Sequence, residues 1–173
     1  AEKWFGEIPR SEPVAPLAPR PVVLTEEKRV VLEDRVQLPR VYLAWPTAAA
    51  YSPPSAALDA LASLLADGKN SRLYKRLVYA LQVAQDVAAF QRAGSVASVF
   101  RVFVTARAGH TLEEIVGLVD EEIARLQAEP PSEREVVRFQ NRTETVAYRL
   151  GTVGDDHLQV NAHAIPHILE QLA

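Results

Sequence analysis

The sequence predicts an α+β fold, a two-layer sandwich in which helices cover one face of an antiparallel or mixed sheet. Two kinds of apolar spacing support this prediction. In some segments apolar residues alternate at the period of a strand, and in others they recur at the period of a helix. The segments come in the order strand, strand, helix, helix, strand, strand, helix, helix, which is typical of helices packed against a sheet.

Two strands should open the domain, at residues 28–34 and 38–45. Apolar residues tend to alternate in both segments, most clearly at Val41, Leu43 and Trp45, which would share one face of a strand. A short turn would join the two strands.

A pair of helices should follow. Ser52 before two prolines is a helix-start signal, and apolar residues keep helical spacing until Gly68, which supplies a C-terminal stop. Ser71 should begin the second helix, which would continue to about Leu81.

Residues 83–91 and 96–106 predict a long hairpin that turns around Gly94, because both segments are rich in β-branched and aromatic residues. The second segment is apolar on both faces. We therefore expect it to be the central strand.

Two capping boxes predict the last pair of helices. They are Thr111 with Glu114 and Ser132 with Glu135. In a capping box the hydroxyl of the first residue accepts a hydrogen bond from the backbone amide three residues later, and the carboxylate there accepts one from the amide of the first residue. Apolar stripes follow both boxes. They are Leu112, Ile115, Val116, Val119, Ile123 and Leu126 in the first helix, and Val136, Phe139, Thr143, Ala147 and Leu150 in the second.

Composition excludes several classes of protein. The 173 residues suit one domain, and with 48% apolar residues, 24% charged residues and a net charge of −3 the chain lacks the basic excess of a nucleic-acid-binding protein. No apolar run reaches the length of a membrane span. Because the chain has no cysteine, disulfides and thiolate zinc sites are excluded.

Three segments define the expected domain organisation. Residues 9–21 contain five prolines and should form an extended linker. Residues 1–8 would be the end of a preceding domain, and residues 22–173 would form the main domain, cut short at its C-terminal end.

The segment from Gly68 to Leu77 carries a motif, G-x-x-S-R-L-Y-x-x-L. With the run RVQLPRVYLAWPT and the N-terminal WFGEIP, it resembles the second, non-catalytic domain of pitrilysin/insulinase-family zinc metallopeptidases, which include the mitochondrial processing peptidases. In that family the motif is followed by Arg and then by G-L-x-Y, and this Arg and Tyr assist catalysis where they are present. The corresponding positions hold Val78 and Gln85.

The resemblance implies a domain that contributes shape and no catalytic group. It would help to form a chamber for unfolded peptides, beside an upstream zinc-bearing domain and a second homologous half or subunit. The alternative is an assembly protein related to the inactive processing-peptidase core subunits. The resemblance suggests a bacterial source, and the compartment stays open between cytoplasm and periplasm.

A zinc site of this family needs H-x-x-E-H, in which two imidazoles bind the metal and the Glu is the general base. The nearest match places Pro166 between His163 and His167 where that Glu belongs, so we expect no metal site. We interpret His110 as a loop residue.

Two clusters of charged residues are interpreted as structural. Asp155 and Asp156 could bind a hard cation, but adjacent acids in a polar loop more often face solvent or cap a helix. Arg72, Lys75 and Arg76 should lie on the exposed side of their helix or contact a partner domain, while the leucines between them face the sheet.

Overall fold

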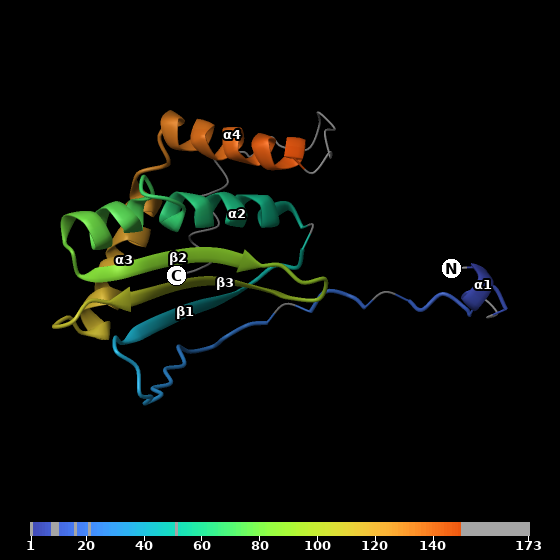
Figure 1. The fold of residues 1–173 in the computed structure, drawn as a ribbon, viewed down its shortest axis with the longest axis horizontal. Helices are drawn as coiled ribbons and strands as arrows, with labels where there is room; N and C mark the ends of the chain where they lie inside the picture. The colour runs from blue at the N-terminus through green and yellow to red at the C-terminus, as the bar shows by residue number, and fades with distance from the viewer. Residues whose placement is uncertain (1, 8–10, 16, 21, 51, 150–173) are drawn as a thin grey trace.

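The computed structural model describes residues 2–7, 11–15, 17–20, 22–50 and 52–149. These residues form an α+β fold in which a small sheet packs against helices (Figure 1). In chain order the elements are α1 (Glu2–Phe5), β1 (Arg40–Thr47), α2 (Pro53–Ala66), the π-helix η1 (Tyr74–Ala80), β2 (Ala84–Arg92), β3 (Ser98–Ala106), α3 (Leu112–Ala128) and α4 (Glu133–Arg149).

The sheet has three strands in the order β1-β3-β2, and both pairings are antiparallel. The prediction of a hairpin with a central second strand is therefore confirmed. Across the sheet, Val102 of β3 lies between Leu43 of β1 and Ala89 of β2. Because side chains alternate between the two faces of a strand, this register places the buried apolar residues of β3 and their partners on one face.

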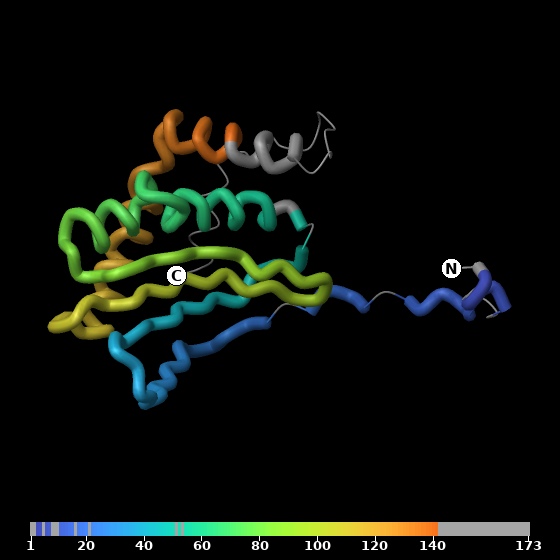
Figure 2. Tube along the Cα trace, viewed as in Figure 1, coloured from blue at the N-terminus to red at the C-terminus, as the bar shows by residue number. Residues whose placement is uncertain are grey.

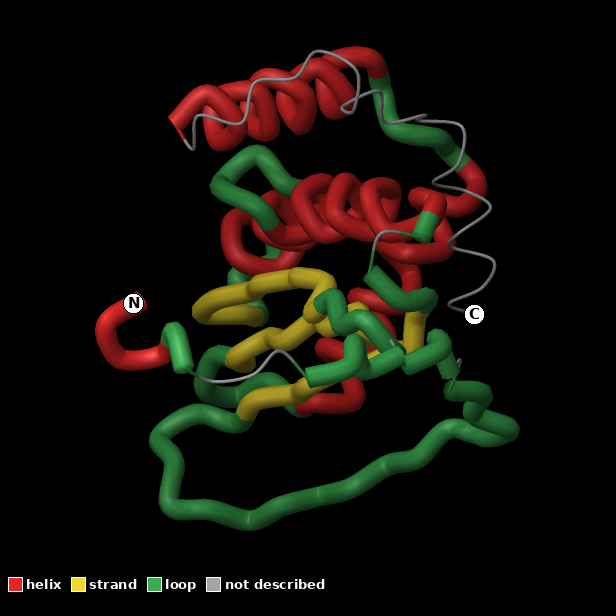
Figure 3. Tube along the Cα trace, turned by 90° about the vertical axis from the view of Figure 1, so that its right-hand side faces the viewer, coloured by secondary structure: helices red, strands yellow, loops and turns green. Residues whose placement is uncertain are grey.

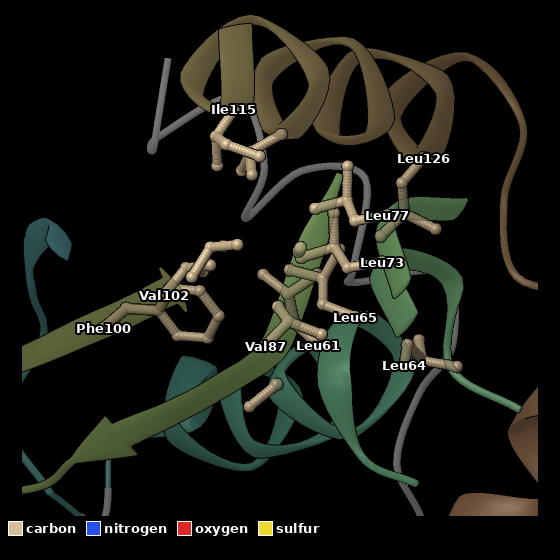
Figure 4. Close-up of a cluster of buried hydrophobic side chains, with 14 of the residues drawn as sticks. Leu61, Leu64, Leu65, Leu73, Leu77, Val87, Phe100, Val102, Ile115 and Leu126 are labelled. Carbon is tan, nitrogen blue, oxygen red and sulfur yellow. The ribbon is translucent and has the colours of Figure 1, made fainter. Parts of the chain in front are cut away.

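Helices cover that apolar face and close the core (Figure 4). Phe100, Val102 and Val104 of β3 are fully buried there, against leucines of α2 and η1 and the apolar stripe of α3. The fully buried helical residues are Leu61, Leu65, Leu73, Leu77, Ile115, Val119 and Leu126. Each side chain of this size contributes roughly 1.5–3 kcal/mol by leaving water, so the core holds the two layers together.

The strand predicted at residues 28–34 is wrong. Residues 22–39 contain neither strand nor helix, and Val30, Val31 and Leu32 are each at least 80% exposed. In Figures 1 and 3 this part of the chain runs as a long loop beyond the β1 edge of the sheet. Alternating apolar residues show only that a segment could pair, whereas a strand also needs a partner edge at hydrogen-bonding distance, which lies outside the local sequence.

The described residues of the proline-rich segment before this loop contain neither helix nor strand. Figure 2 shows it leading away from the sheet toward the short helix α1. Its described residues are exposed, and the backbone amide of Arg20 donates a 2.9 Å hydrogen bond to the carbonyl of Val96 in the β2–β3 turn.

The predicted helix boundaries agree with the structure at several points. Ser52 precedes the first residue of α2, and Gly68 follows its end with a φ of 74°, the left-handed conformation that glycine adopts without a steric penalty. Thr111 caps α3, because its hydroxyl accepts a 3.1 Å hydrogen bond from the amide of Glu114. The Glu114 carboxylate lies 3.0 Å from Nδ1 of His110, beside the cap.

The second capping box differs in detail from its prediction. The Glu135 carboxylate does accept from the backbone amide of Ser132, at 2.9 Å, but the Ser132 hydroxyl donates to the same carboxylate at 2.8 Å. The amide of Glu135 donates to the carbonyl oxygen of Ser132 at 2.9 Å. The helix start is therefore held by the carboxylate, which has further partners described below.

The helix that follows Ser71 is present but wider than an ordinary α-helix. Residues 74–80 form a π-helix, and the amide of Leu81 donates to the carbonyl of Arg76, five residues earlier, at 2.9 Å. Sequence periodicity over two turns cannot distinguish these helix types, because their repeats differ by less than one residue per turn. Among the described residues, no helix combines the length and apolar character needed to cross a membrane.

Replacement of Thr111 by Ala should lower the free energy of unfolding by about 1 kcal/mol, because the amide of Glu114 loses its side-chain acceptor. Urea denaturation measures the change, with Ser95→Ala at the exposed β2–β3 turn as the control. An equal loss in both variants would contradict the assigned cap.

Candidate functional site

The motif from Gly68 to Leu77 folds into the turn between α2 and η1 and the start of η1. Ser71 is 1% exposed, and its hydroxyl donates a 2.7 Å hydrogen bond to the carbonyl oxygen of Gly68. The amide of Lys75 then donates to the carbonyl of Ser71 at 3.0 Å, which begins the helix. A small hydroxyl residue at position 71 therefore satisfies a buried turn.

Arg72 connects this turn to the start of α4. Its Nε lies 2.9 Å from Oε1 of Glu135, and its Nη2 lies 3.1 Å from Oε2. Both side chains are only 17% exposed, so this two-point pairing is shielded from water. The same carboxylate holds the backbone of Ser132, as described above. One carboxylate thus joins two helix starts that are far apart in the sequence.

The Arg72 guanidinium, together with the hydrogen bonds from Ser132, lowers the pKa of Glu135 from its ordinary value of 4.5 to about 2. Partial burial acts in the opposite direction and is outweighed. The carboxylate therefore stays ionised at every pH near neutrality, and its pairing with Arg72 is structural.

Arg76 pairs with α3 in the same manner. Its Nη1 donates to the carbonyl of Leu118 at 3.3 Å and lies 3.4 Å from the nearly buried carboxylate of Glu122. Its other terminal nitrogen contacts Glu121. Arg72 and Arg76 therefore both bind helices of their own domain.

The prediction for the basic residues of this helix is correct in part. Leu73 and Leu77 are fully buried and Lys75 is exposed, as expected. Arg72 and Arg76 were expected on the exposed side or against a partner domain, and this is wrong. Their long side chains reach along the helix surface to carboxylates of α3 and α4, which are too distant in sequence to be recognised from local pattern.

The two positions that would assist catalysis in the resembled family lie at either end of the turn from η1 to β2. Val78 is half-buried against the core. Gln85 is exposed and lies at an irregularity of the β2–β3 pairing, between Ala84 and Asp86. An aliphatic side chain cannot stabilise negative charge, and a neutral amide lacks the acidity of a phenol.

Gln82 has a φ of 56°. Among the described residues, it is the one residue other than glycine with a positive φ. It occupies the glycine position of the family pattern G-L-x-Y, three residues before Gln85. The amide of Val83 donates back to the carbonyl of Leu77 at 3.0 Å, six residues earlier. This arrangement is a Schellman-type helix end widened by the π-helix, and a left-handed residue is what it requires.

The described residues offer no site for a metal ion, since they contain no group of three or more His, Cys, Asp or Glu side chains suitably placed. His110 lies in the loop before α3, where it pairs with Glu114. The other sequence candidates, His163, His167, Asp155 and Asp156, lie outside the described residues.

A family model for the peptidase M16 inactive domain matches residues 1–143. The chain belongs to this family. The match confirms the resemblance drawn from the segment around Ser71 and Arg72.

Several solved structures share this fold. A protease from Helicobacter pylori superposes with a TM-score of 0.70 at 18% identity, over 80% of this chain and 39% of that one. The inactive peptidase domain of a candidate zinc protease from Bordetella parapertussis superposes with a TM-score of 0.60 at 19% identity. The match covers 83% of this chain and 80% of that one. A peptidase M16 inactive domain from Pseudomonas fluorescens superposes with a TM-score of 0.57 at 16% identity. The match covers 75% of this chain and 29% of that one.

The chain therefore spans less than half the length of the Helicobacter and Pseudomonas chains that it matches. At these identities the likeness shows the fold alone. No curated protein matches the chain by sequence.

Sequence reasoning missed a second candidate surface, the face of the sheet opposite the core. We call it the outer face and define it by six residues: Arg40, Tyr42, Phe90, Arg92, Arg101 and Phe103, which the strand register places on one side. The signal was available, because Arg40 and Tyr42 alternate with Val41 and Leu43, and Arg101 and Phe103 alternate with buried valines.

The pairing of Arg72 with Glu135 predicts a specific pH dependence. A lowered pKa contributes stability that is present above the ordinary value of 4.5 and is lost as pH falls toward about 2. Glu135→Gln should therefore be less stable than the wild type at pH 7, by roughly 1–2 kcal/mol after allowance for partial exposure, and the difference should shrink as the pH approaches 2.

Urea denaturation of both proteins between pH 7 and pH 2 measures this difference. Glu133→Gln, at an exposed acid in the same turn of α4, is the matched control. A gap between Glu135→Gln and the wild type that stays constant with pH would refute the assigned role of the pair.

Replacement of Gln82 by Gly should leave stability unchanged or raise it by up to about 1 kcal/mol, because relief of the left-handed strain exceeds or offsets the entropy that glycine adds to the unfolded chain. Gln82→Val should cost about 1–2 kcal/mol, since a β-branched residue is poorly tolerated there. Thermal denaturation compares both with Gln85→Gly, where φ is not positive and the same change should destabilise. Destabilisation by Gln82→Gly as large as in that control would contradict this account.

Proposed function

We propose that this chain is a non-catalytic domain of a zinc-dependent peptidase, and that it helps to form the substrate chamber beside a separate zinc-bearing domain. The carrying observation is the match to the M16 inactive domain over residues 1–143. Proteins described as zinc proteases are among those of like fold. In this proposal the zinc, the general base and the peptide-cleaving step all belong to the other domain.

The chemistry of the η1–β2 turn supports the proposal. Val78 and Gln85 can neither stabilise an oxyanion by charge nor donate from an acidic hydroxyl. The charged side chains nearby, Arg72 and Arg76, are already paired with carboxylates of α3 and α4. We therefore assign these four residues to the architecture of the domain and give them no catalytic role.

The N-terminal segment supplies the proposed connection. Residues 1–8 would complete an upstream domain, residues 9–21 would be the tether and residues 22–173 would form the domain itself. The described part of the tether is exposed and without helix or strand. A short, proline-rich tether keeps two domains at a high effective concentration, so that even a weak interface between them is populated.

The test compares the upstream domain with and without residues 1–173 in hydrolysis of unfolded peptides. We expect removal to reduce kcat/KM by at least about tenfold, because a chamber that lacks a wall no longer orients the peptide near the metal. The matched control restores the chain as a separate polypeptide at high concentration, which should recover part of the activity. Full activity without residues 1–173 would refute the proposal, and an upstream domain that contains no zinc motif would favour the assembly role.

A further inference from the structure

The outer face of the sheet is open among the described residues and carries an unusual combination of aromatic rings and arginines. Figure 1 looks onto the sheet with α3 behind it. Tyr42 is 67% exposed and Phe90 is 40% exposed, whereas the residues that alternate with them face the core. An exposed apolar surface on a soluble domain commonly marks a binding site.

Three aromatic rings form a band across the strands. Phe103, on the central strand, has its ring centroid 6.1 Å from that of Tyr42 on β1 and 6.0 Å from that of Phe90 on β2. Alternate side chains of an extended peptide are spaced by roughly 6.6 Å. The band is therefore commensurate with the side chains along one side of an extended peptide.

The charge on this face is predominantly positive. Arg40 is held in place, since its Nε donates to Thr105 at 2.7 Å, its guanidinium lies 5.5 Å from the Phe103 ring and its Nη2 lies 3.7 Å from Asp86. Arg92 and Arg101 have no carboxylate of the described residues within ion-pair distance. They stand on a chain whose net charge is −3, so the positive charge is local to this face.

Arg101 lies at the centre of the face and is accessible. It occupies the central strand, with Ala44 opposite it on β1 and Phe90 opposite it on β2. Ala44 is small and exposed, and Arg101 as a whole is half-buried. A partly desolvated arginine without a carboxylate partner gains more from an anionic ligand than a fully solvated one does.

We propose that the outer face binds extended peptides that carry acidic and aromatic side chains. The carboxylates would pair with Arg101 and Arg92, and the aromatic side chains would pack on the band of Tyr42, Phe103 and Phe90. This inference rests on the proposed function, because it assigns a substrate class to the chamber wall. The aromatic band favours a peptide over a simple polyanion, since the rings add contacts that phosphate groups cannot use.

The test uses the complete 173-residue chain and three fluorescein-labelled peptides of about twelve residues. The first contains Glu, Phe, Gly and Ser, and the other two replace each Glu by Gln or by Lys. Fluorescence anisotropy should show the highest affinity for the Glu peptide and the lowest affinity for the Lys peptide. The preference should weaken as salt is raised, because exposed charge pairs are screened.

Arg101→Gln should weaken binding of the Glu peptide about fivefold and leave the Gln peptide nearly unchanged, because only the charge pair is lost. Arg134→Gln, at an exposed arginine on α4, is the matched control and should change neither. Arg92→Gln, at an exposed strand end, tests the same charge effect with little risk to folding. Tyr42→Ala should weaken both the Glu and the Gln peptides.

Equal binding of the Glu and Lys peptides, or equal losses in Arg101→Gln and Arg134→Gln, would overturn the inference. The inference would also fail if a single-stranded DNA oligonucleotide bound at least as tightly as the Glu peptide and depended on Arg101. It would fail too if sedimentation showed a dimer that depends on Arg101. Either result would assign a different binding partner to the outer face. A chain that lacks the peptide preference but still raises hydrolysis by the upstream domain would refute this inference alone and leave the proposed function intact.

Discussion

The central strand β3 imposes the main constraint on the architecture. It pairs with a strand on each side and buries Phe100, Val102 and Val104 completely on one face. A sheet of three strands cannot cover that face by itself, so helices must cover it. The apolar positions of α2, η1 and α3 supply this cover. The spacing of apolar residues in these three helices therefore follows from the need to shield one face of β3 from water.

Ion pairs then fix the helices to one another. Arg72 binds Glu135 at the start of α4, and Arg76 binds Glu122 on α3. Paired charges of this kind are costly to break, because removal of one partner leaves the other poorly solvated. In this chain the arginine of the S-R-L segment thus has an architectural role that is independent of catalysis.

Local pattern was sufficient for much of the fold, because caps, glycine stops and periodicity depend on neighbouring residues. Thr111, Gly68 and the β2–β3 hairpin are examples. It failed where the answer depends on distant parts of the chain. The segment around Val30 has the composition of a strand and lacks a partner, and Arg72 finds its carboxylate 63 residues away. The π-helix was beyond reach for another reason, since a short segment does not fix the helical repeat.

The two faces of the sheet separate stability from recognition. On the core face, side-chain identity is constrained by packing, because a change of even one methylene group is felt in a close-packed interior. On the outer face, Tyr42 and Arg101 contribute less to that packing, since Tyr42 is exposed and Arg101 is half-buried. The backbone register nevertheless couples the faces, since each strand supplies both through alternate residues. In the proposed role, substitutions on the outer face could therefore alter peptide preference while the core stays unchanged.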